Sequence, residues 1–303
     1  MENQKFFFKD DTSSHDNFFT TKGKKGVLFI PPKYLKEGIK YARENNMRAI
    51  RISPGIYADE LDPPPPVDLE FQAFDYFCEL DFLHIDNNFN IGKVSGIDSL
   101  YNLNIRKLIL EKNINFSLDF EKFEHLEHLY VTETSRLSLF RFPSSLKELC
   151  ITNFKSLDLS KLSTLINLLR LELRKSKIIS LQGLESCRKL EKLIIFSAPS
   201  LQDISVINQL KIKYLRLEKC PKLNIESISQ IYSNSLLDMS LFMKIENLNF
   251  LSNYPNLEKL FFSEVTDGNL NPILDSSLKY ISFSSDKKHY SHKMKQLNDL
   301  LTR

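Results

Sequence analysis

The chain has 303 residues, of which 42% are hydrophobic and 26% charged, as in a folded protein rather than a disordered one. Its 41 basic and 38 acidic residues leave a net charge of +3, too small for an overall field that would favour nucleic acid. No apolar run approaches the roughly eighteen residues of a membrane-spanning helix, and Phe6–Phe8 is far shorter than a signal peptide core. These features predict a cytoplasmic protein with no membrane contact.

Residues 1–79 show no repeat and are expected to form an N-terminal α/β capping segment. Residues 26–30 read as a strand, 35–45 follow helical spacing, and 49–52 read as a second strand. Such a strand–helix–strand unit fits either a degenerate first coil of a repeat array or a small capping domain. Because the open end of an array exposes its core, we expect it to act as a cap, with an independent function as the alternative.

A proline-rich stretch over residues 62–67 follows and is expected to be a stiff, extended connector. Phe74, Phe77 and Leu80 then lie on one face of a predicted short helix. This helix should lead into the first full repeat.

Residues 80–285 repeat one pattern ten times: an apolar residue, two variable residues, an apolar residue, one variable residue and an apolar residue. The spacing between copies is 20 to 25 residues, and such a period predicts a solenoid. Each copy should form one short strand whose inward side chains are buried only by stacking on neighbouring copies. The central apolar residues are Leu83, Leu108, Leu129, Leu149, Leu171, Leu193, Leu215, Met239, Leu260 and Ile281.

This register resembles the leucine-rich-repeat family, and the copy from Leu168 to Leu190 is similar to its 22-residue, internalin-type subclass. The resemblance implies an α/β solenoid of about ten repeats, shaped as an irregular horseshoe with a parallel sheet on its concave face. It also implies an Asn three residues after the last strand residue, where the amide bonds the turn backbone. Asn88 and Asn113 fit this position, whereas its later occupants are Thr134, Phe154, Ser176, Ala198, Cys220, Lys244, Val265 and Asp286. Turns that lack the amide need other hydrogen-bond partners, so uneven curvature is expected.

Residues 286–303 are predicted to form a C-terminal capping helix. Met294, Leu297, Leu300 and Leu301 recur at helical spacing and give one apolar face, while the outer face is basic. The segment is too short and too weakly charged for an arm that binds a membrane or nucleic acid.

Motifs for catalysis, cofactors and metals are absent from the sequence. Its eight glycines form neither a dinucleotide-binding nor a phosphate-binding loop, and there is no metalloprotease motif and no nucleophile elbow. His125 with His128, and His289 with His292, have spacing compatible with a metal but no third ligand, so we interpret them as surface residues. Cys78, Cys150, Cys187 and Cys220 show no paired spacing and are interpreted as small buried residues. The sequence therefore predicts no enzyme, no cofactor and no metal site.

The outward positions of the ten strands form the predicted binding wall, roughly 43 Å long at about 4.8 Å per strand gap. Its charged positions are balanced between the two signs. The basic ones are Lys107, Arg170, Arg174, Lys192, Arg216 and Lys259, and the acidic ones are Asp86, Glu111, Glu148, Glu172, Glu218 and Asp238. A neutral mosaic does not suit a phosphate backbone, which argues against nucleic acid. Aromatic residues with a nearby arginine are typical of interface hot spots. The candidate partner-binding residues are Phe196, Tyr214, Arg216, Phe242, Phe261, Tyr130 and Tyr280, although these rings could also pack only on one another.

From the resemblance and this wall we expect a non-catalytic scaffold that binds another protein through the concave face of its repeats. Two narrower hypotheses are an immunity protein that occludes a toxin and an effector or adaptor that docks on a signalling protein. A hypothesis of a different class makes residues 1–79 a small enzymatic domain, with the repeats as its substrate-recognition arm.

Overall fold

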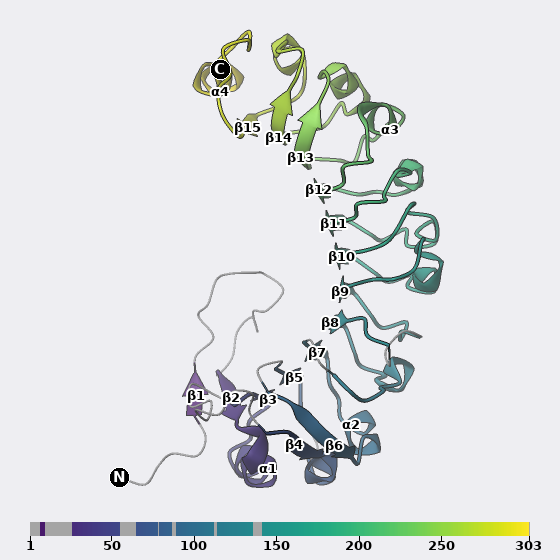
Figure 1. Cartoon of the computed structure of the whole chain (residues 1–303), viewed down its shortest axis with the longest axis vertical. Helices are drawn as coiled ribbons and strands as arrows, with labels where there is room; N and C mark the ends of the chain where they lie inside the picture. The colour runs from purple at the N-terminus through teal and green to yellow at the C-terminus, as the bar shows by residue number, and fades with distance from the viewer. Residues whose placement is uncertain are drawn as a thin grey trace. The chain divides into compact units, whose positions relative to one another are not determined.

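The computed structural model describes residues 7–9, 26–54, 65–77, 79–86, 89–111, 114–135 and 141–302. The chain divides into two compact units, unit 1 (Met1–Ser145) and unit 2 (Leu146–Arg303). In each unit, successive coils contribute one strand each to a sheet, and short helices lie on the other side of the coils (Figure 1).

Unit 1 contains a sheet whose strands follow one another in chain order. The strands are β1 (Phe7–Lys9), β2 (Val27–Ile30), β3 (Ala49–Ile52), β5 (Phe82–Ile85), β7 (Lys107–Leu110) and β8 (His128–Thr132). All of its pairs are parallel except the antiparallel pair of β1 with β2. A separate parallel pair joins β4 (Val67–Glu70) to β6 (Ile91–Ser95). The helices are η1 (Pro32–Tyr34), α1 (Leu35–Glu44), η2 (Phe71–Phe74), α2 (Asp98–Tyr101) and η3 (Phe120–Lys122).

The strands before residue 80 continue the ladder of the repeats. Ile50 of β3 is the register partner of Leu28 on one side and of Leu83, the first predicted central residue, on the other. All three side chains are buried. Because β2 and β3 share the register of the coils that follow, the strand–helix–strand unit has the form of degenerate coils. Its role as a cap, and the boundary at residue 79, stay predictions.

The short helix expected at Phe74, Phe77 and Leu80 is shorter than predicted and ends at Phe74. The amides of Asp75 and Phe77 donate to the carbonyls of Gln72 and Phe74, and this three-residue spacing tightens the segment into a 3-10 helix and a turn. Phe74, Phe77 and Leu80 are nevertheless all buried.

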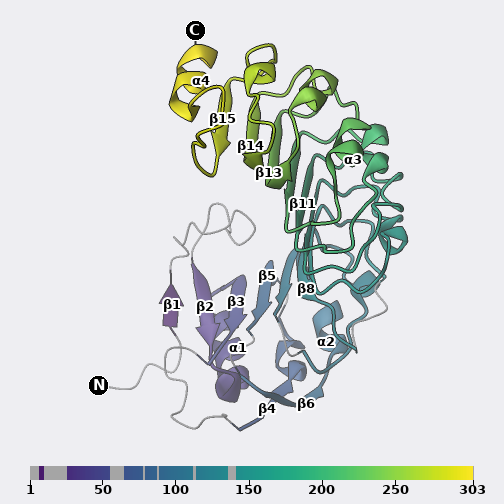
Figure 2. The same ribbon diagram turned by 45° about the horizontal axis from the view of Figure 1, so that its top comes forward.

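Unit 2 forms one parallel sheet that runs through seven coils. The strands line the inner side of the unit and the short helices its outer side (Figures 1 and 2). The strands are β9 (Glu148–Thr152), β10 (Arg170–Arg174), β11 (Lys192–Phe196), β12 (Tyr214–Glu218), β13 (Asp238–Ile245), β14 (Lys259–Val265) and β15 (Tyr280–Phe283). The helices are η4 (Ser160–Leu162), η5 (Ser205–Gln209), α3 (Ile225–Ser229), η6 (Asn249–Asn253), η7 (Asn271–Ile273) and α4 (Met294–Leu301).

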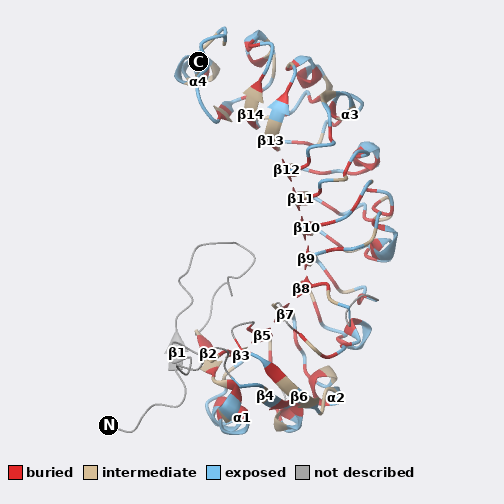
Figure 3. Ribbon diagram, in the orientation of Figure 1, coloured by how far each residue is buried: buried red, intermediate tan, exposed pale blue. Residues whose placement is uncertain are grey.

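The predicted central residues form the core of both units. In unit 2 they are register partners from strand to strand, as Leu171, Leu193 and Leu215 illustrate. All ten side chains, from Leu83 to Ile281, are at most 2% exposed. Figure 3 colours the buried residues along the ribbon red. The register derived from the period is therefore confirmed.

Backbone hydrogen bonds between neighbouring coils close the turns in which the sequence lacks the expected Asn. The residue after each of β9 to β12 has a left-handed φ: Asn153 61°, Lys175 56°, Ser197 64° and Lys219 55°. This conformation lets the amides of Asn153, Lys175 and Ser197 donate to the following coil, at the carbonyls of Arg174, Phe196 and Glu218. The residue before each of β10 to β12 donates in the opposite direction, to the preceding coil. The Leu169 amide donates to the Lys147 carbonyl, the Glu191 amide to Leu169 and the Lys213 amide to Glu191. The coils of β10 and β11 thus donate to both of their neighbours.

Lys244 does not occupy the buried turn position that counting assigned to it. The register between β13 and β14 shifts between Leu241 and Lys244, so β13 carries one residue more than its neighbour there. Ile245, not Lys244, is then the buried partner of Val265. The assignment was wrong because a fixed offset ignores this β-bulge.

Helix α4 covers the free edge of β15 (Figure 2). The Asn298 amide accepts from the Ile281 N–H and donates to the Ile281 carbonyl, each at 2.9 Å. The Phe283 N–H donates to the Met294 sulfur at 3.5 Å. Helix α4 lies within the segment predicted to be helical, and its role as a cap stays a prediction. Its apolar face differs from the predicted one: Leu297 is buried whereas Leu300 is 43% exposed, because Asn298 faces the strand instead. Pairing the edge in this way protects it against association with another sheet.

Replacing Asn298 with Ala should lower the free energy of unfolding by about 1–3 kcal/mol, because the Ile281 N–H and C=O both lose their partner. The exposed edge should also promote self-association. Urea unfolding and sedimentation velocity measure the two effects, with Asp299→Ala on the exposed side of the helix as the control. Equal stability and equal mass for the two variants would show that α4 does not protect the edge.

Cys150, Cys187 and Cys220 are buried thiols, as predicted, and Cys78 lies outside the described residues. Burial raises the pKa of Cys187, and raises the pKa of Cys220 to about 11. Across the described ranges, no helix is long and apolar enough to cross a membrane.

Candidate functional site

The outward side of the unit 2 sheet, called the concave face here, presents three rows of side chains that the register defines. The first row is Glu148, Arg170, Lys192, Tyr214, Asp238, Lys259 and Tyr280. The second is Cys150, Glu172, Ile194, Arg216, Ser240, Phe261 and Ser282. The third is Thr152, Arg174, Phe196, Glu218 and Phe242. Alternation along each strand places the core leucines on the opposite side.

Cations and aromatic rings alternate over strands β11 to β14. The Arg216 guanidinium lies 4.5 Å from the centre of the Phe242 ring, and the Phe242 and Phe261 rings are 4.2 Å apart. The Lys192 ammonium lies 4.5 Å from the Tyr214 ring and the Lys219 ammonium 4.7 Å from the Phe196 ring. We call these seven residues the patch: Lys192, Phe196, Tyr214, Arg216, Lys219, Phe242 and Phe261. Its five non-lysine members are half-buried, so each is partly accessible.

The structure brings together five of the seven residues that the sequence singled out, and a sixth, Tyr280, lies on the adjacent strand β15 and is 53% exposed. Tyr130 belongs to unit 1, where it packs against the buried cluster of Val27, Phe82 and Ile109. Phe242 and Phe261 do pack on each other, so the alternative of mutual packing holds for that pair.

Lys219 is a member of the patch that the sequence did not identify. It follows β12 directly and has a left-handed φ of 55°, which turns its side chain back over the Phe196 ring of the neighbouring strand. Lys219 was not among the candidates because only residues on the strands were considered. A lysine directly after the last strand residue was the available signal.

The carboxylates of the concave face are held mainly by arginines. Glu172 lies 2.8 Å from the Arg170 Nη2 and 2.6 Å from the Arg174 Nε. Glu218 is 2.8 Å from the Arg216 Nη2. Burial raises the pKa of Asp238, whereas burial and the nearby charge of Arg170 lower the pKa of Lys192. Glu172 and Glu218 are therefore paired with arginines, whereas the charge of Lys192 acts on Asp238 without a direct ion pair among the described residues.

Unit 1 has a buried polar network at the corresponding strand positions. Arg51 contacts Asp86 at 2.5 Å, and the His84 Nε2 lies 2.9 Å from the Glu111 Oε1. Burial alone would raise the pKa of Asp86, but the hydrogen bond and charge of Arg51 outweigh it and lower the pKa. This network stabilises the charged side chains within unit 1, and most of the surface of these side chains is buried.

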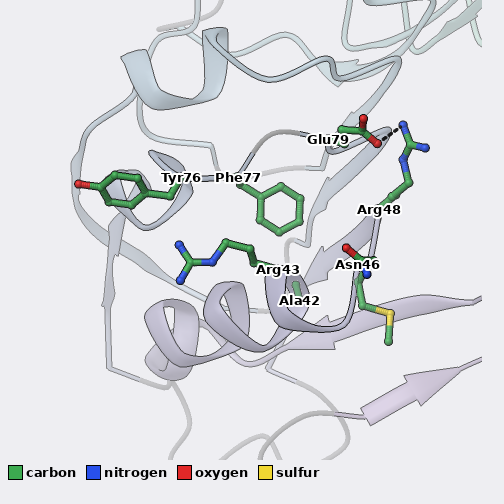
Figure 4. A pocket seen from close by; sticks show the side chains of 8 residues that line it. Ala42, Arg43, Asn46, Arg48, Tyr76, Phe77 and Glu79 are labelled. Atoms are coloured by element: carbon green, nitrogen blue, oxygen red, sulfur yellow. Dashed lines mark ion pairs between the residues drawn. The ribbon is translucent and has the colours of Figure 1, made fainter.

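A pocket of about 460 Å³ lies in unit 1 beside α1 and the turn after η2 (Figure 4). Its lining is Ala42, Arg43, Asn46, Met47, Arg48, Tyr76, Phe77 and Glu79. Its one carboxylate, Glu79, is 3.0 Å from the Arg48 guanidinium, which also contacts Asp81 at 3.1 Å.

Within the part of the chain that the structure describes, no three His, Cys, Asp or Glu side chains come together as metal ligands. The His289 Nε2 lies 3.2 Å from the Val265 carbonyl, and the neighbour of His128 is the Glu127 carboxylate at 3.9 Å. Both histidines therefore have contacts other than a metal.

The chain was compared with protein families, curated proteins and solved structures. No family model matches the chain. It is 26% identical over 207 residues to a probable disease resistance protein of Arabidopsis thaliana, covering 61% of this chain and 27% of that protein. The chain thus spans about a quarter of the length of that relative.

Two solved structures are similar to the chain in fold. An internalin from Listeria monocytogenes is 17% identical with a TM-score of 0.47, covering 72% of this chain and 66% of its own. A leucine-rich-repeat protein from Leptospira interrogans is 16% identical with a TM-score of 0.38, covering 85% and 88%. The evidence for the fold is in the coils themselves, which each place a parallel strand and its central leucine in register with the next. The chain is a leucine-rich-repeat solenoid.

Proposed function

We propose that this chain is a non-catalytic scaffold that binds another protein through the patch on strands β11 to β14. The observation that carries the proposal is the set of four half-buried rings on one face of a regular sheet, three in contact with a cation and the fourth, Phe261, stacked against Phe242. Aromatic and arginine side chains with restricted motion are the groups that dominate binding energy at interfaces.

The sheet presents these side chains without further ordering. Each strand is paired on both sides, and the core leucines beneath it are buried. A partner that binds there does not have to order a loop, which is a major cost of association. The four strands span roughly 14 Å at about 4.8 Å per gap, enough for an extended segment or one helix of a partner to cross them.

The proposal places the protein in the cytoplasm and includes both narrower roles, occlusion of a toxin and docking as an effector or adaptor. The identity of the captured partner separates them: an immunity protein captures a toxin whose activity it abolishes. An adaptor captures a signalling protein whose activity persists in the complex.

The test compares patch variants in capture from a lysate of the source organism, followed by calorimetry with the recovered partner. Phe196→Ala, Tyr214→Ala, Arg216→Ala, Phe242→Ala and Phe261→Ala should include anchors whose loss weakens binding by about 2 kcal/mol or more. The control is Glu258→Ala at the rim, where an exposed ion pair to Lys279 contributes little. Unfolding curves for each variant establish that the fold is intact.

Normal binding by all five variants, together with loss of binding on substitution in residues 26–79, would move the site to the N-terminal segment. The pocket beside α1 would then be the first surface to test.

A further inference from the structure

The patch and the strands around it carry more positive than negative charge. From β11 to β14 the three rows and the turn after β12 hold four cations, Lys192, Arg216, Lys219 and Lys259, and two carboxylates, Glu218 and Asp238. Further along β13 and β14, Lys244 and Glu264 pair with each other at 3.5 Å. Glu218 is engaged by Arg216 at 2.8 Å. The local balance therefore differs from the even mosaic of the whole concave face.

The two lysines of the patch contact rings rather than carboxylates. Lys192 lies over Tyr214 and Lys219 over Phe196, and neither forms an ion pair among the residues whose placement the structure gives. Lys192 is also half-buried, next to Arg170 on the adjoining strand. A cation that is partly removed from water beside a like charge gains more from an incoming carboxylate than a fully exposed one does.

The arrangement of the rings distinguishes between two kinds of anionic partner. A single-stranded nucleic acid binds by stacking its bases on open aromatic faces. Here Arg216 and Phe261 both lie against Phe242, and a lysine occupies one face of Tyr214 and one face of Phe196. Glu218 and Asp238 would in addition repel a continuous phosphate backbone. Separate carboxylates on an amphipathic polypeptide meet neither obstacle.

We infer that the patch binds an acidic segment of a protein partner, in which an apolar or aromatic side chain packs on Phe242 and Phe261 and flanking carboxylates pair with Lys192 and Lys219. This inference rests on the proposed function, since it specifies the partner for the same surface. The two lysines lie near opposite ends of the strands: Lys192 is in the first row, and Lys219 directly follows the third row. Lys219 follows Tyr214, the register partner of Lys192, by five residues, so at about 3.3 Å per residue their strand positions are separated by roughly 16 Å, and the two carboxylates should be about five residues apart in an extended segment.

The test is a selection of random 16-residue peptides, displayed on phage, against the full chain with counter-selection against Phe242→Ala. The selected peptides should be enriched at least about threefold in Asp and Glu over the input library, next to an apolar or aromatic residue. Synthetic versions should bind at least about tenfold more weakly to Lys192→Gln/Lys219→Gln, measured by fluorescence polarisation. Lys161→Gln, an exposed lysine in η4 on the outer side of the same unit, is the matched control and should bind normally.

Each other outcome overturns a defined part of the inference. Peptides that depend on Phe242 but lack acidic enrichment, or that bind the double lysine variant normally, would reject the acidic partner and leave the proposed function standing. A single-stranded oligouridylate that binds more tightly than the selected peptides, and that requires the same lysines, would replace the peptide with nucleic acid. Failure to select any peptide that depends on the patch would count against both the acidic partner and the proposed function.

Discussion

Replacing Leu193 with Ala should lower the free energy of unfolding by about 2–5 kcal/mol, because it removes buried methyl groups and leaves a cavity. Leu193 is fully buried in β11, with Leu171 and Leu215 as its register partners. Coils contact only their neighbours, so amide hydrogen exchange should accelerate first in β10, β11 and β12. Urea unfolding measures the total loss, and exchange followed by mass spectrometry locates it.

The control for this substitution is Ile166→Ala, an exposed apolar residue of the same unit that should change stability by less than about 0.5 kcal/mol. Exchange that rises evenly through unit 2, or a loss no larger than that of the control, would contradict nearest-neighbour coupling around Leu193.

Glu172→Gln should also be strongly destabilising, with an expected loss of about 3 kcal/mol. The Glu172 side chain is only 7% exposed and binds Arg170 and Arg174 at 2.8 and 2.6 Å. Removing the carboxylate charge leaves two guanidinium groups near each other, and breaking a buried pair typically costs about 3–5 kcal/mol. We expect the lower end of that range because Arg174 is 32% exposed and can be solvated.

Glu191→Gln is the matched control, since its ion pair with Lys213 at 2.7 Å is about half exposed on both sides. Such a surface pair contributes at most about 1 kcal/mol. If chemical denaturation gave the same loss for both variants, Glu172 would be an ordinary surface residue rather than a structural part of the concave face.

Most of the fold follows from the repeat period, because one physical requirement recurs in every coil. A strand whose inward side chains are leucines is stable only next to another such strand, so the spacing determines both the sheet and its register. That reasoning correctly placed the residues from Leu83 to Ile281 in one row per unit. The repeat period left open whether β2 and β3 belong to the same sheet, because Leu28 and Ile50 lie in segments without the full repeat pattern.

Features that depend on a single residue were less predictable. The β-bulge of β13 shifts Lys244 by one residue from the position that the repeat period assigned to it, and no local sequence pattern predicts the extra residue. Asn298 replaced Leu300 on the inner face of α4 because its amide pairs with an edge strand, an interaction that apolar periodicity does not register. The candidate aromatic residues came from strand alternation and do lie together, whereas Lys219 depends on a left-handed turn.

The direction of the backbone bonds between coils restricts what can terminate this solenoid. The turns after β9, β10 and β11 send amide donors to the following coil, and among the described residues β15 has no further strand to receive its amides. The C-terminal segment supplies acceptors instead: the Asn298 Oδ1 for Ile281, the Met294 sulfur for Phe283 and the Tyr290 hydroxyl for Val265. A helix taken from another protein would therefore need hydrogen-bond acceptors at these positions, in addition to an apolar face that packs on the last coil. A graft that placed lysines at these three contacts would bring no acceptor for the amides of Ile281, Phe283 and Val265.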